Sequence, residues 1–248
     1  MYEGSFVMGS AEIKSNELSN RNVVISNYVA RSAQTLSLSE KRILMAGIAQ
    51  LGGVNAEVVL SAQEYADTYG VDVHTAYDQL KAAAGALMKR TLSWQIQDGK
   101  KIGVQHTIWV QGYRYFKDQG IVKFKFSEYI FPFLFELQRE FTKYQLKQAT
   151  ALRSIHSWRL LELMEQMRQQ QDNSGWLVMS IEEFWHAMEA TESYRKNFSL
   201  LRKWVIEPAV KELTEKDNWL IEWEAIKRGR KVTALRFQFE RNPQGGLF

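Results

Sequence analysis

Residues 180–240 contain the clearest fold signal in the chain: SIEEFWHAMEATESYRKNFSLLRKWVIEPAVKELTEKDNWLIEWEAIKRGRKVTALRFQFE. It predicts a short helix capped by Ser180 and, after a bend, a long helix from about Arg195 to Lys216. Five apolar residues at helical spacing face inward on the long helix: Phe198, Leu201, Val205, Ala209 and Leu213. Pro208 lies inside this helix, where it either kinks the backbone or marks a register break.

A hairpin follows the two helices. WLIEWEA at 219–225 and VTALRFQFE at 232–240 alternate in polarity, which predicts two strands joined by a turn around Lys227 to Lys231. Upstream, LVMS at 177–180 predicts a short strand, and a helix is expected from Thr150 to Gln171. Helix, strand, helix-turn-helix and hairpin in this order indicate a winged helix, whose second helix enters a major groove while its hairpin contacts backbone.

The same order occurs earlier in the chain. SEKRILMAGIAQL at 39–51 predicts a helix with Ser39 as its N-cap, and VVLSAQEYADTYGV at 58–71 predicts a strand, a cap at Ser61 and a short helix ending at Gly70. A second helix follows in 71–90, with Val73, Tyr77, Leu80, Ala84 and Leu87 on one face. LSWQIQ, a turn at 98–100 and IGVQHTIWV predict a hairpin, to which IVKFKFS at 121–127 adds a third strand.

The repeated order predicts an α+β protein of two tandem winged-helix domains. We expect a loose tail at 1–20, an N-terminal winged helix at 21–143, a C-terminal winged helix at 144–241 and a second tail at 242–248. The connecting segment EFTKYQLKQAT holds neither Gly nor Pro, so a semi-rigid helical link is expected between Thr142 and Thr150.

Composition is that of a folded, non-membrane chain. Of the 248 residues 45% are apolar and 24% charged, and no apolar run approaches the ~20 residues that span a bilayer. The absence of cysteine excludes disulfides and catalytic thiols and agrees with a reducing cytoplasm. The net charge of +4 favours a polyanionic partner only weakly, but 193–241 holds twelve Lys or Arg and seven Asp or Glu. Positive charge is therefore concentrated near the C-terminus.

Two groups of polar residues in the second unit suit DNA. The outward face of the second recognition helix offers Arg195, Lys196, Asn197, Ser199, Arg202 and Lys203. Arginine can pair with guanine and asparagine with adenine, while lysine and serine commonly hold phosphates. The predicted wing adds four cations: Lys227, Arg228, Arg230 and Lys231. A solvated helix face and a basic solubilising loop are the alternatives, and Glu222 and Glu224 are expected to neutralise part of the wing charge.

The first recognition helix is mixed in charge and contains the smooth run Ala82 to Ala84, so contact with protein is as plausible as contact with DNA. The candidate contacts with DNA backbone in this unit are His74, Thr75, Lys81, Lys89 and Arg90.

Signatures of enzymes are missing. The sequence has no phosphate-binding loop, and its four histidines form no H-x-H or H-x-x-x-H pair, so we expect neither catalysis nor a metal or cofactor site. A nicking tyrosine at Tyr113 or Tyr115 is disfavoured because no histidine pair could hold the metal. The eight tryptophans are expected mostly in the core rather than as base-stacking platforms.

These residues resemble the initiator replication proteins of iteron-containing bacterial plasmids. The resemblance covers about Val23 to Phe239, and SIHSWRLLELM, WVIEPAVKEL and IKRGRKVTALRFQF carry most of it. It implies a cytoplasmic, non-enzymatic protein that binds direct repeats at a plasmid origin, helps to melt DNA and recruits a host DnaA-type initiator and the replicative helicase. It also implies that the C-terminal domain reads the repeat, while the N-terminal domain contacts backbone and forms the dimer that represses its own promoter at an inverted repeat. A winged-helix repressor without an initiation role is the nearest alternative, and an origin-nicking enzyme is the more distant one.

Overall fold

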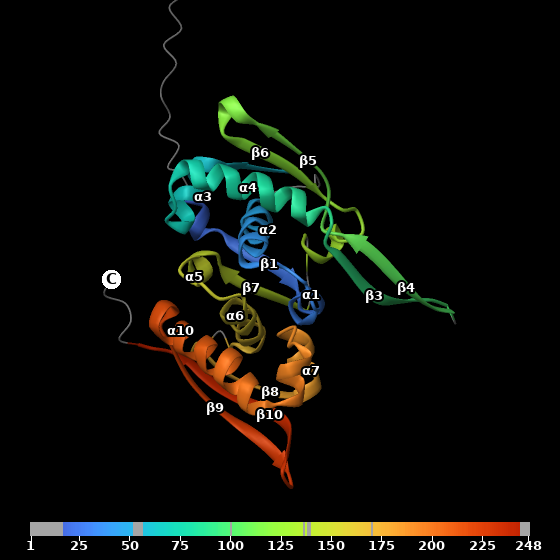
Figure 1. Cartoon of the computed structure of the whole chain (residues 1–248), viewed down its shortest axis with the longest axis vertical. Coiled ribbons are helices and arrows are strands. Elements are labelled where there is room, and N and C mark those ends of the chain that lie inside the picture. The colour runs from blue at the N-terminus through green and yellow to red at the C-terminus, as the bar shows by residue number, and fades with distance from the viewer. Residues whose placement is uncertain are drawn as a thin grey trace, which may run out of the picture.

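Two winged helices are stacked along the long axis of the molecule, with a three-stranded sheet at each end and helices between the sheets (Figure 1). The computed structural model describes residues 17–243 apart from 52–56, 100, 136, 138–139 and 170, and the side chains of 93–98 and 102 lie outside the description. The predicted tails therefore fall largely outside the described residues. Leu18, which the sequence analysis assigns to the first tail, is buried in a short 3-10 turn, η1 (Leu18–Asn20).

The N-terminal winged helix has the predicted order of elements. It also contains β5 (Val110–Phe116), a strand before the predicted third strand that was not expected from the sequence. Its elements are α2 (Leu38–Gln50), β2 (Glu57–Ser61), α3 (Ala62–Tyr69), α4 (Val73–Leu87), β5 (Val110–Phe116), η2 (Lys117–Gln119), β6 (Ile121–Phe126) and η3 (Phe131–Phe133). The inward face of α4 differs from the expectation, because Val73 is 40% exposed and Tyr77 half-buried, while Ala76 and Ala83 are buried.

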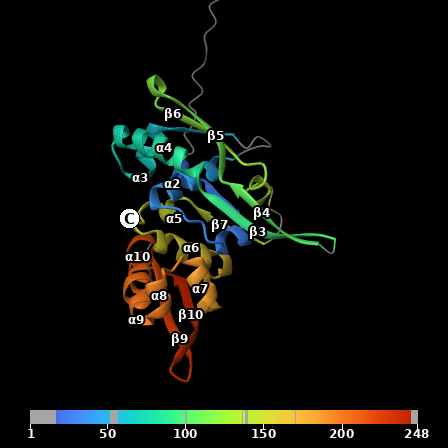
Figure 2. The ribbon, with the colours of Figure 1, turned by 45° about the vertical axis from the view of Figure 1, so that its right-hand side comes forward.

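The first predicted hairpin forms, but the third strand pairs elsewhere. β3 (Thr91–Asp98) and β4 (Lys101–Ile108) form a two-stranded sheet of their own, whereas β6 lies between β2 and β5. Buried and more exposed residues alternate along β6. Its buried Val122, Phe124 and Phe126 pack against the helices from the central strand of the sheet, which accounts for this placement. The hairpin β3–β4 projects from the side of the domain (Figure 2).

The N-cap of α2 is Ser37 and not the predicted Ser39. The backbone N–H of Glu40 donates to the Ser37 hydroxyl at 3.3 Å, and the backbone N–H of Ser37 donates to the Glu40 carboxylate at 2.6 Å. This reciprocal pair is a capping box, which requires the acidic residue three positions after the cap. Ser61 and Ser180 cap α3 and α7 (Ile181–Ala187) in the same way, as predicted.

The connection between the units is a strand, so the expected helical link is wrong for most of its length. β7 (Phe141–Gln145) pairs antiparallel with β1 (Asn22–Ser26), the strand that leads into α1 (Asn27–Arg31). Only α5 (Lys147–Thr150) is helical. Buried Thr142 and Tyr144 alternate with exposed Phe141 and Lys143, which is the period of a strand.

The C-terminal winged helix repeats the arrangement. Its elements are α6 (Ile155–Met167), β8 (Ser174–Ser180), α7, α8 (Glu192–Lys196), α9 (Phe198–Leu201), η4 (Arg202–Ile206), α10 (Glu207–Asp217), β9 (Trp219–Arg228) and β10 (Lys231–Arg241). α6 is shorter than the predicted Thr150 to Gln171. The backbone N–H groups of Arg153 and Ser154 donate to the Glu212 carboxylate at 2.6 and 3.2 Å, which holds the preceding segment outside the helix.

The predicted long helix is interrupted at two points. Asn197 has an extended backbone and separates α8 from α9, and a π-helical turn, η4, comes directly before α10. Pro208 explains the π-helical turn, because it lacks a backbone N–H and its ring displaces the preceding turn from α-helical register. The expected inward residues Leu201, Val205, Ala209 and Leu213 are buried, and Phe198 is half-buried.

Buried charges join the two units. Lys41 of α2 lies 2.7 Å from Glu162 of α6, and both side chains are fully buried. Glu162 also accepts a hydrogen bond from Tyr144 at 3.1 Å and lies 3.5 Å from Arg159. Burial lowers the pKa of Lys41 to about 8, although Glu162 opposes this shift. Nearby, the Glu189 carboxylate accepts from the backbone N–H groups of Gln34 and Thr35, so the interface is polar as well as closely packed.

Candidate nucleic-acid interface

The predicted reading residues of the C-terminal unit are exposed and lie along α8, α9 and η4. Arg195, Lys196, Asn197, Ser199, Arg202 and Lys203 all have exposed side chains. The break at Asn197 divides them into two groups, with Arg195 and Lys196 on α8 and the others on the segment that begins at Asn197. The sequence predicts one long helix from about Arg195, with a kink or register break at Pro208, and the break at Asn197 was not expected.

Several of these side chains already have local partners. The Arg195 Nε atom donates to the Ala190 carbonyl at 2.8 Å, and the Asn197 side chain accepts from the backbone N–H of Ser199 at 3.0 Å. Lys196 pairs with Glu192 at 2.5 Å, and Arg202 pairs with Glu207 at 2.6 Å. Exposed ion pairs of this kind are worth ~0.2–1 kcal/mol, so a phosphate or a base edge can replace the carboxylate at little cost.

The predicted wing is the turn between β9 and β10, and it projects beyond the body of the unit (Figure 2). Gly229 has a φ of +63°, a conformation that favours glycine and permits the two-residue turn Gly229–Arg230. The four predicted cations, Lys227, Arg228, Arg230 and Lys231, are exposed, and no carboxylate of the described residues forms an ion pair with them. Glu224 pairs instead with Arg236 at 2.6 Å, so the expected neutralisation of the wing by this residue is wrong.

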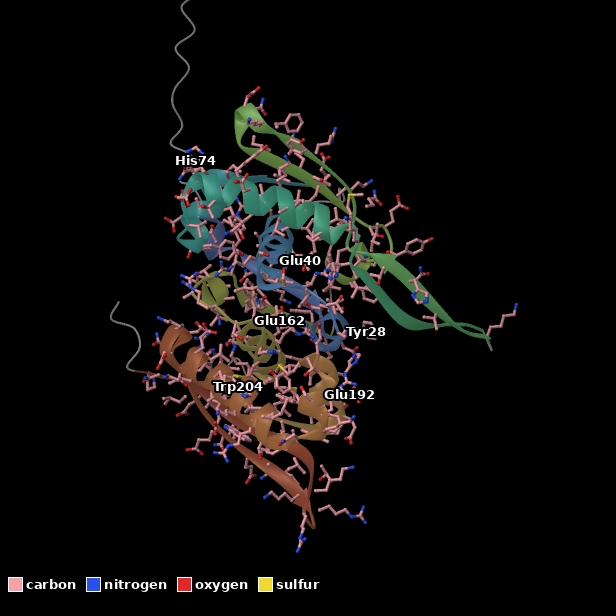
Figure 3. The ribbon with its side chains drawn as sticks, viewed as in Figure 1. Tyr28, Glu40, His74, Glu162, Glu192 and Trp204 are labelled. Atoms are coloured by element: carbon pink, nitrogen blue, oxygen red, sulfur yellow. The ribbon has the colours of Figure 1, made fainter. Side chains whose placement is uncertain are left out.

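The candidate contacts of the N-terminal unit lie at both ends of α4 and, for Lys81, near its middle. His74 and Thr75 are exposed in its first turn, where the Asp72 side chain accepts from the Thr75 N–H at 2.9 Å (His74 is labelled in Figure 3). Hydrogen bonds from the Thr75 side chain and backbone lower the pKa of Asp72, which keeps a negative charge at the start of the helix. The Lys81 ammonium lies 4.2 Å from the ring centre of Tyr115. Lys89 is exposed after the helix ends.

Arg90 has a structural partner. Its Nε and Nη2 atoms donate to the two oxygens of Glu40 at 3.0 and 3.1 Å, which fixes the end of α4 to the start of α2. Burial alone would raise the pKa of Glu40, but the hydrogen bonds from Arg90 and Ser37 outweigh it and lower the pKa. The Arg90 side chain is 40% exposed, so a phosphate contact would have to share a guanidinium that is already bound.

Trp204 is a candidate contact that the sequence analysis missed. It lies on η4 with 56% of its surface exposed, and the Lys203 ammonium is 5.0 Å from its ring centre (Figure 3). The signal in the sequence was its position between the inward residues Leu201 and Val205, off the apolar stripe. Trp176 on β8 is also exposed, so the assignment of tryptophans to the core fails for these two.

The four histidines lie in separate elements, and no three His, Asp or Glu side chains of the described residues are grouped as a metal site would require. No helix in the described part of the chain is long and apolar enough to cross a membrane.

Comparison with known families agrees with the two-unit architecture. Residues 22–165 match the family described as Initiator Replication protein, WH1, and residues 180–239 match Initiator Rep protein, WH2. The chain belongs to the initiator replication protein family. The initiator is also 22% identical over 238 residues to an uncharacterised 27.6 kDa protein of Escherichia coli, an alignment that covers 89% of this chain and 97% of that one.

A solved relative shares the whole arrangement of this initiator. The Pi initiator protein, crystallised in complex with iteron DNA, superimposes with a TM-score of 0.76 at 18% identity, covering 91% of this chain and 99% of that one. The WH1 domain of the replication protein MSBI1.176 is 25% identical and covers 44% of this chain and 89% of its own, with a TM-score of 0.40. The tandem winged-helix fold is thus that of an initiator with a solved structure.

Proposed function

We propose that this initiator binds directly repeated double-stranded sites, the iterons, at a plasmid origin in the bacterial cytoplasm. The observation that carries the proposal is the exposed basic surface of α8, α9, η4 and the wing, in a fold that Pi initiator protein combines with iteron DNA. A helix that enters a major groove reads base edges, and a neighbouring basic wing releases counterions from phosphates.

In this proposal the two units have different tasks. The C-terminal unit reads sequence through Arg202, Trp204 and the side chains around them, while the wing cations hold the backbone. The N-terminal unit adds backbone contacts through His74, Thr75 and Lys81, and a dimer formed through this unit represses the initiator's own promoter at an inverted repeat. The initiator carries out no chemistry itself; it promotes local melting and recruits the host DnaA-type initiator and the replicative helicase.

The test is a binding survey of the purified chain with duplexes tiled across the DNA that flanks its own gene, with nonspecific competitor. Selective binding to a directly repeated element supports the proposal, and selective binding to an inverted repeat alone favours a repressor. Strand cleavage that requires a divalent metal would favour the nicking enzyme and contradict the proposal that the initiator carries out no chemistry.

A further inference from the structure

The outer face of the C-terminal sheet is acidic and partly apolar. Strand register places Trp176, Gln238 and Glu222 in one row and Val178, Arg236 and Glu224 in the next. Phe237 and Phe239 alternate with these residues and point into the core, so both rows face away from the helices. We call the outward residues the acidic face, and they are Trp176, Val178, Leu220, Glu222, Glu224, Arg236, Gln238 and Glu240.

Two carboxylates of the acidic face lack a cation. Arg236 pairs with Glu224 at 2.6 Å, whereas neither Glu222 nor Glu240 forms an ion pair with any described residue. The net charge of the face is −2, from three glutamates and one arginine. Trp176 is 59% exposed, and a groove beside it is lined by Leu220 and the two unpaired glutamates. Tryptophan is enriched in protein contacts, and polar and charged residues form their rims, so this combination suits a protein contact.

The outer face of the N-terminal sheet has the opposite charge. Register places Val59, Lys123 and Arg114 in one row, flanked by Glu57 with Lys125 and by Ile121 with Phe116. These seven residues form the basic face, whose net charge is +2. Arg114 pairs with Glu57 at 2.6 Å, and no described carboxylate pairs with Lys123 or Lys125. Phe116 and Val59 are 37% and 41% exposed, so this face also combines charge with apolar surface.

The two faces lie at opposite ends of the molecule. The sheet β2-β6-β5 closes one end of the long axis and β8-β10-β9 closes the other, with the helices of both units between them (Figure 1). One chain therefore cannot bring its own faces together. A second copy in the same orientation can place its basic face against the acidic face of the first, with two unpaired lysines meeting two unpaired glutamates.

We propose that the acidic face of one copy docks on the basic face of the next, in a head-to-tail contact between initiators. Such a contact is heterologous, because different surfaces meet, and it relates copies that point the same way. This is also the relation between proteins bound to directly repeated sites, so the inference rests on the proposed function. A symmetric dimer on an inverted repeat would use one surface twice and cannot pair these faces.

The contact is expected to be weak in free solution. A heterologous contact that does not close would give filaments if it were tight, and each face is small and partly polar. On DNA, neighbouring sites hold two copies close together, and tethering raises their effective concentration to the order of millimolar. The acidic and basic faces of neighbouring copies would therefore bind each other when the repeats are occupied. Their attraction would fall as salt screens the charges.

The experiment measures occupancy of a duplex with two directly repeated sites, a duplex with one site, and a duplex whose second site is inverted. Wild-type chain should fill the second direct repeat about 5 to 150 times more tightly than a single site, the range of typical couplings, and should show no such gain on the inverted pair. One variant carries Glu222→Lys and Glu240→Lys, and the other carries Lys123→Glu and Lys125→Glu. Each variant by itself should bind a single site as wild-type chain does but should not fill the second direct repeat more tightly.

Mixing the two variants gives the decisive result. Each variant then offers a face that fits the other, so the gain on direct repeats should return, which also shows that both variants fold. A mixture that stays non-cooperative, or wild-type chain that fills direct and inverted pairs alike, overturns the inference. Loss of single-site binding by the Lys123 and Lys125 variant would mean that the basic face contacts DNA, and would overturn it too. Failure of wild-type chain to select any site would instead contradict the proposed function.

Discussion

Lys41 on α2 and Glu162 on α6 form a fully buried ion pair between the two winged helices, with 2.7 Å between Nζ and Oε1. Glu162 lies between two cations, because Arg159 is 3.5 Å from its other oxygen and is buried as well. The Lys41 ammonium also donates to the Gln34 side chain at 2.7 Å. The pair and its partners Gln34, Tyr144 and Arg159 lie on segments of both units, so the network favours one arrangement of the units.

We expect the two partners to be unequal in their contribution to stability. Glu162→Gln removes the carboxylate that forms ion pairs with two buried cations and should lower the free energy of unfolding by about 3–5 kcal/mol. Lys41→Met leaves Glu162 paired with Arg159 and hydrogen-bonded to Tyr144, so this variant should lose less free energy of unfolding. Urea unfolding of both variants measures the difference. Equal losses of stability in the two variants would mean that Arg159 does not stabilise the Glu162 carboxylate when Lys41 is absent.

Asp217 should make stability depend on pH in the acidic range. Burial raises its pKa from 3.8 to about 6, although Arg241 opposes the shift. The folded chain then holds this proton more tightly than the unfolded chain, so ionising Asp217 costs stability as the pH rises from about 4 to about 6. Asp217→Asn keeps an oxygen that can accept from the Trp219 indole.

The stability of the Asp217→Asn variant relative to wild type should therefore increase over the same pH interval. Urea unfolding of both proteins at several pH values gives this difference, in which the titration of all other carboxylates cancels. A difference that does not change with pH would show that Asp217 has an ordinary pKa in the folded chain.

Arg202 and Arg230 should differ in how they bind DNA. Arg202→Ala should lose about 1–3 kcal/mol of affinity for the cognate site and little for other DNA, because a base contact is removed. Arg230→Ala should weaken binding to all sequences alike and reduce the salt slope by about 1, because a phosphate contact is removed. Titrations with cognate and scrambled duplexes at several salt concentrations separate the two patterns. Identical behaviour would contradict the division between reading helix and wing.

Trp204 should contribute specific affinity without charge. Trp204→Ala should weaken cognate binding about tenfold or more, the scale of a good contact in the groove, and leave the salt slope unchanged because no cation is lost. Trp176→Ala is the matched control, since it removes a similarly exposed tryptophan from the sheet face that points away from the helices. On a duplex with one site the control should bind as wild type does. An equal loss in both variants would mean that the effect comes from folding.

Local signals in the sequence were sufficient for the repeated order of elements. Ser61 and Ser180 each stand three residues before a glutamate, and this spacing identifies the capping boxes of α3 and α7. Gly229 marks the wing because a two-residue turn between paired strands needs a positive φ. These features depend on neighbours in the chain and can be read directly.

Features that depend on distant residues could not be predicted. β6 pairs with β2 and β5 rather than with the hairpin before it, because sheet pairing is decided by which strands share a core. Lys41 and Glu162 look like solvated helix residues in the sequence, yet they are buried because each faces the other unit. Trp204 is off the apolar stripe of its helix, so its exposure follows the helical period and departs from the expectation that tryptophans lie mostly in the core.

Sequence-specific binding by this initiator is tested most directly by a competition titration at about 150 mM salt between a duplex that carries the repeat and a scrambled duplex of the same length and composition. The chain should prefer the repeat by about 10³-fold or more, as specific DNA-binding proteins do. Equal affinity for the two duplexes would show that the exposed basic surface binds DNA without reading it, and would contradict the proposed function.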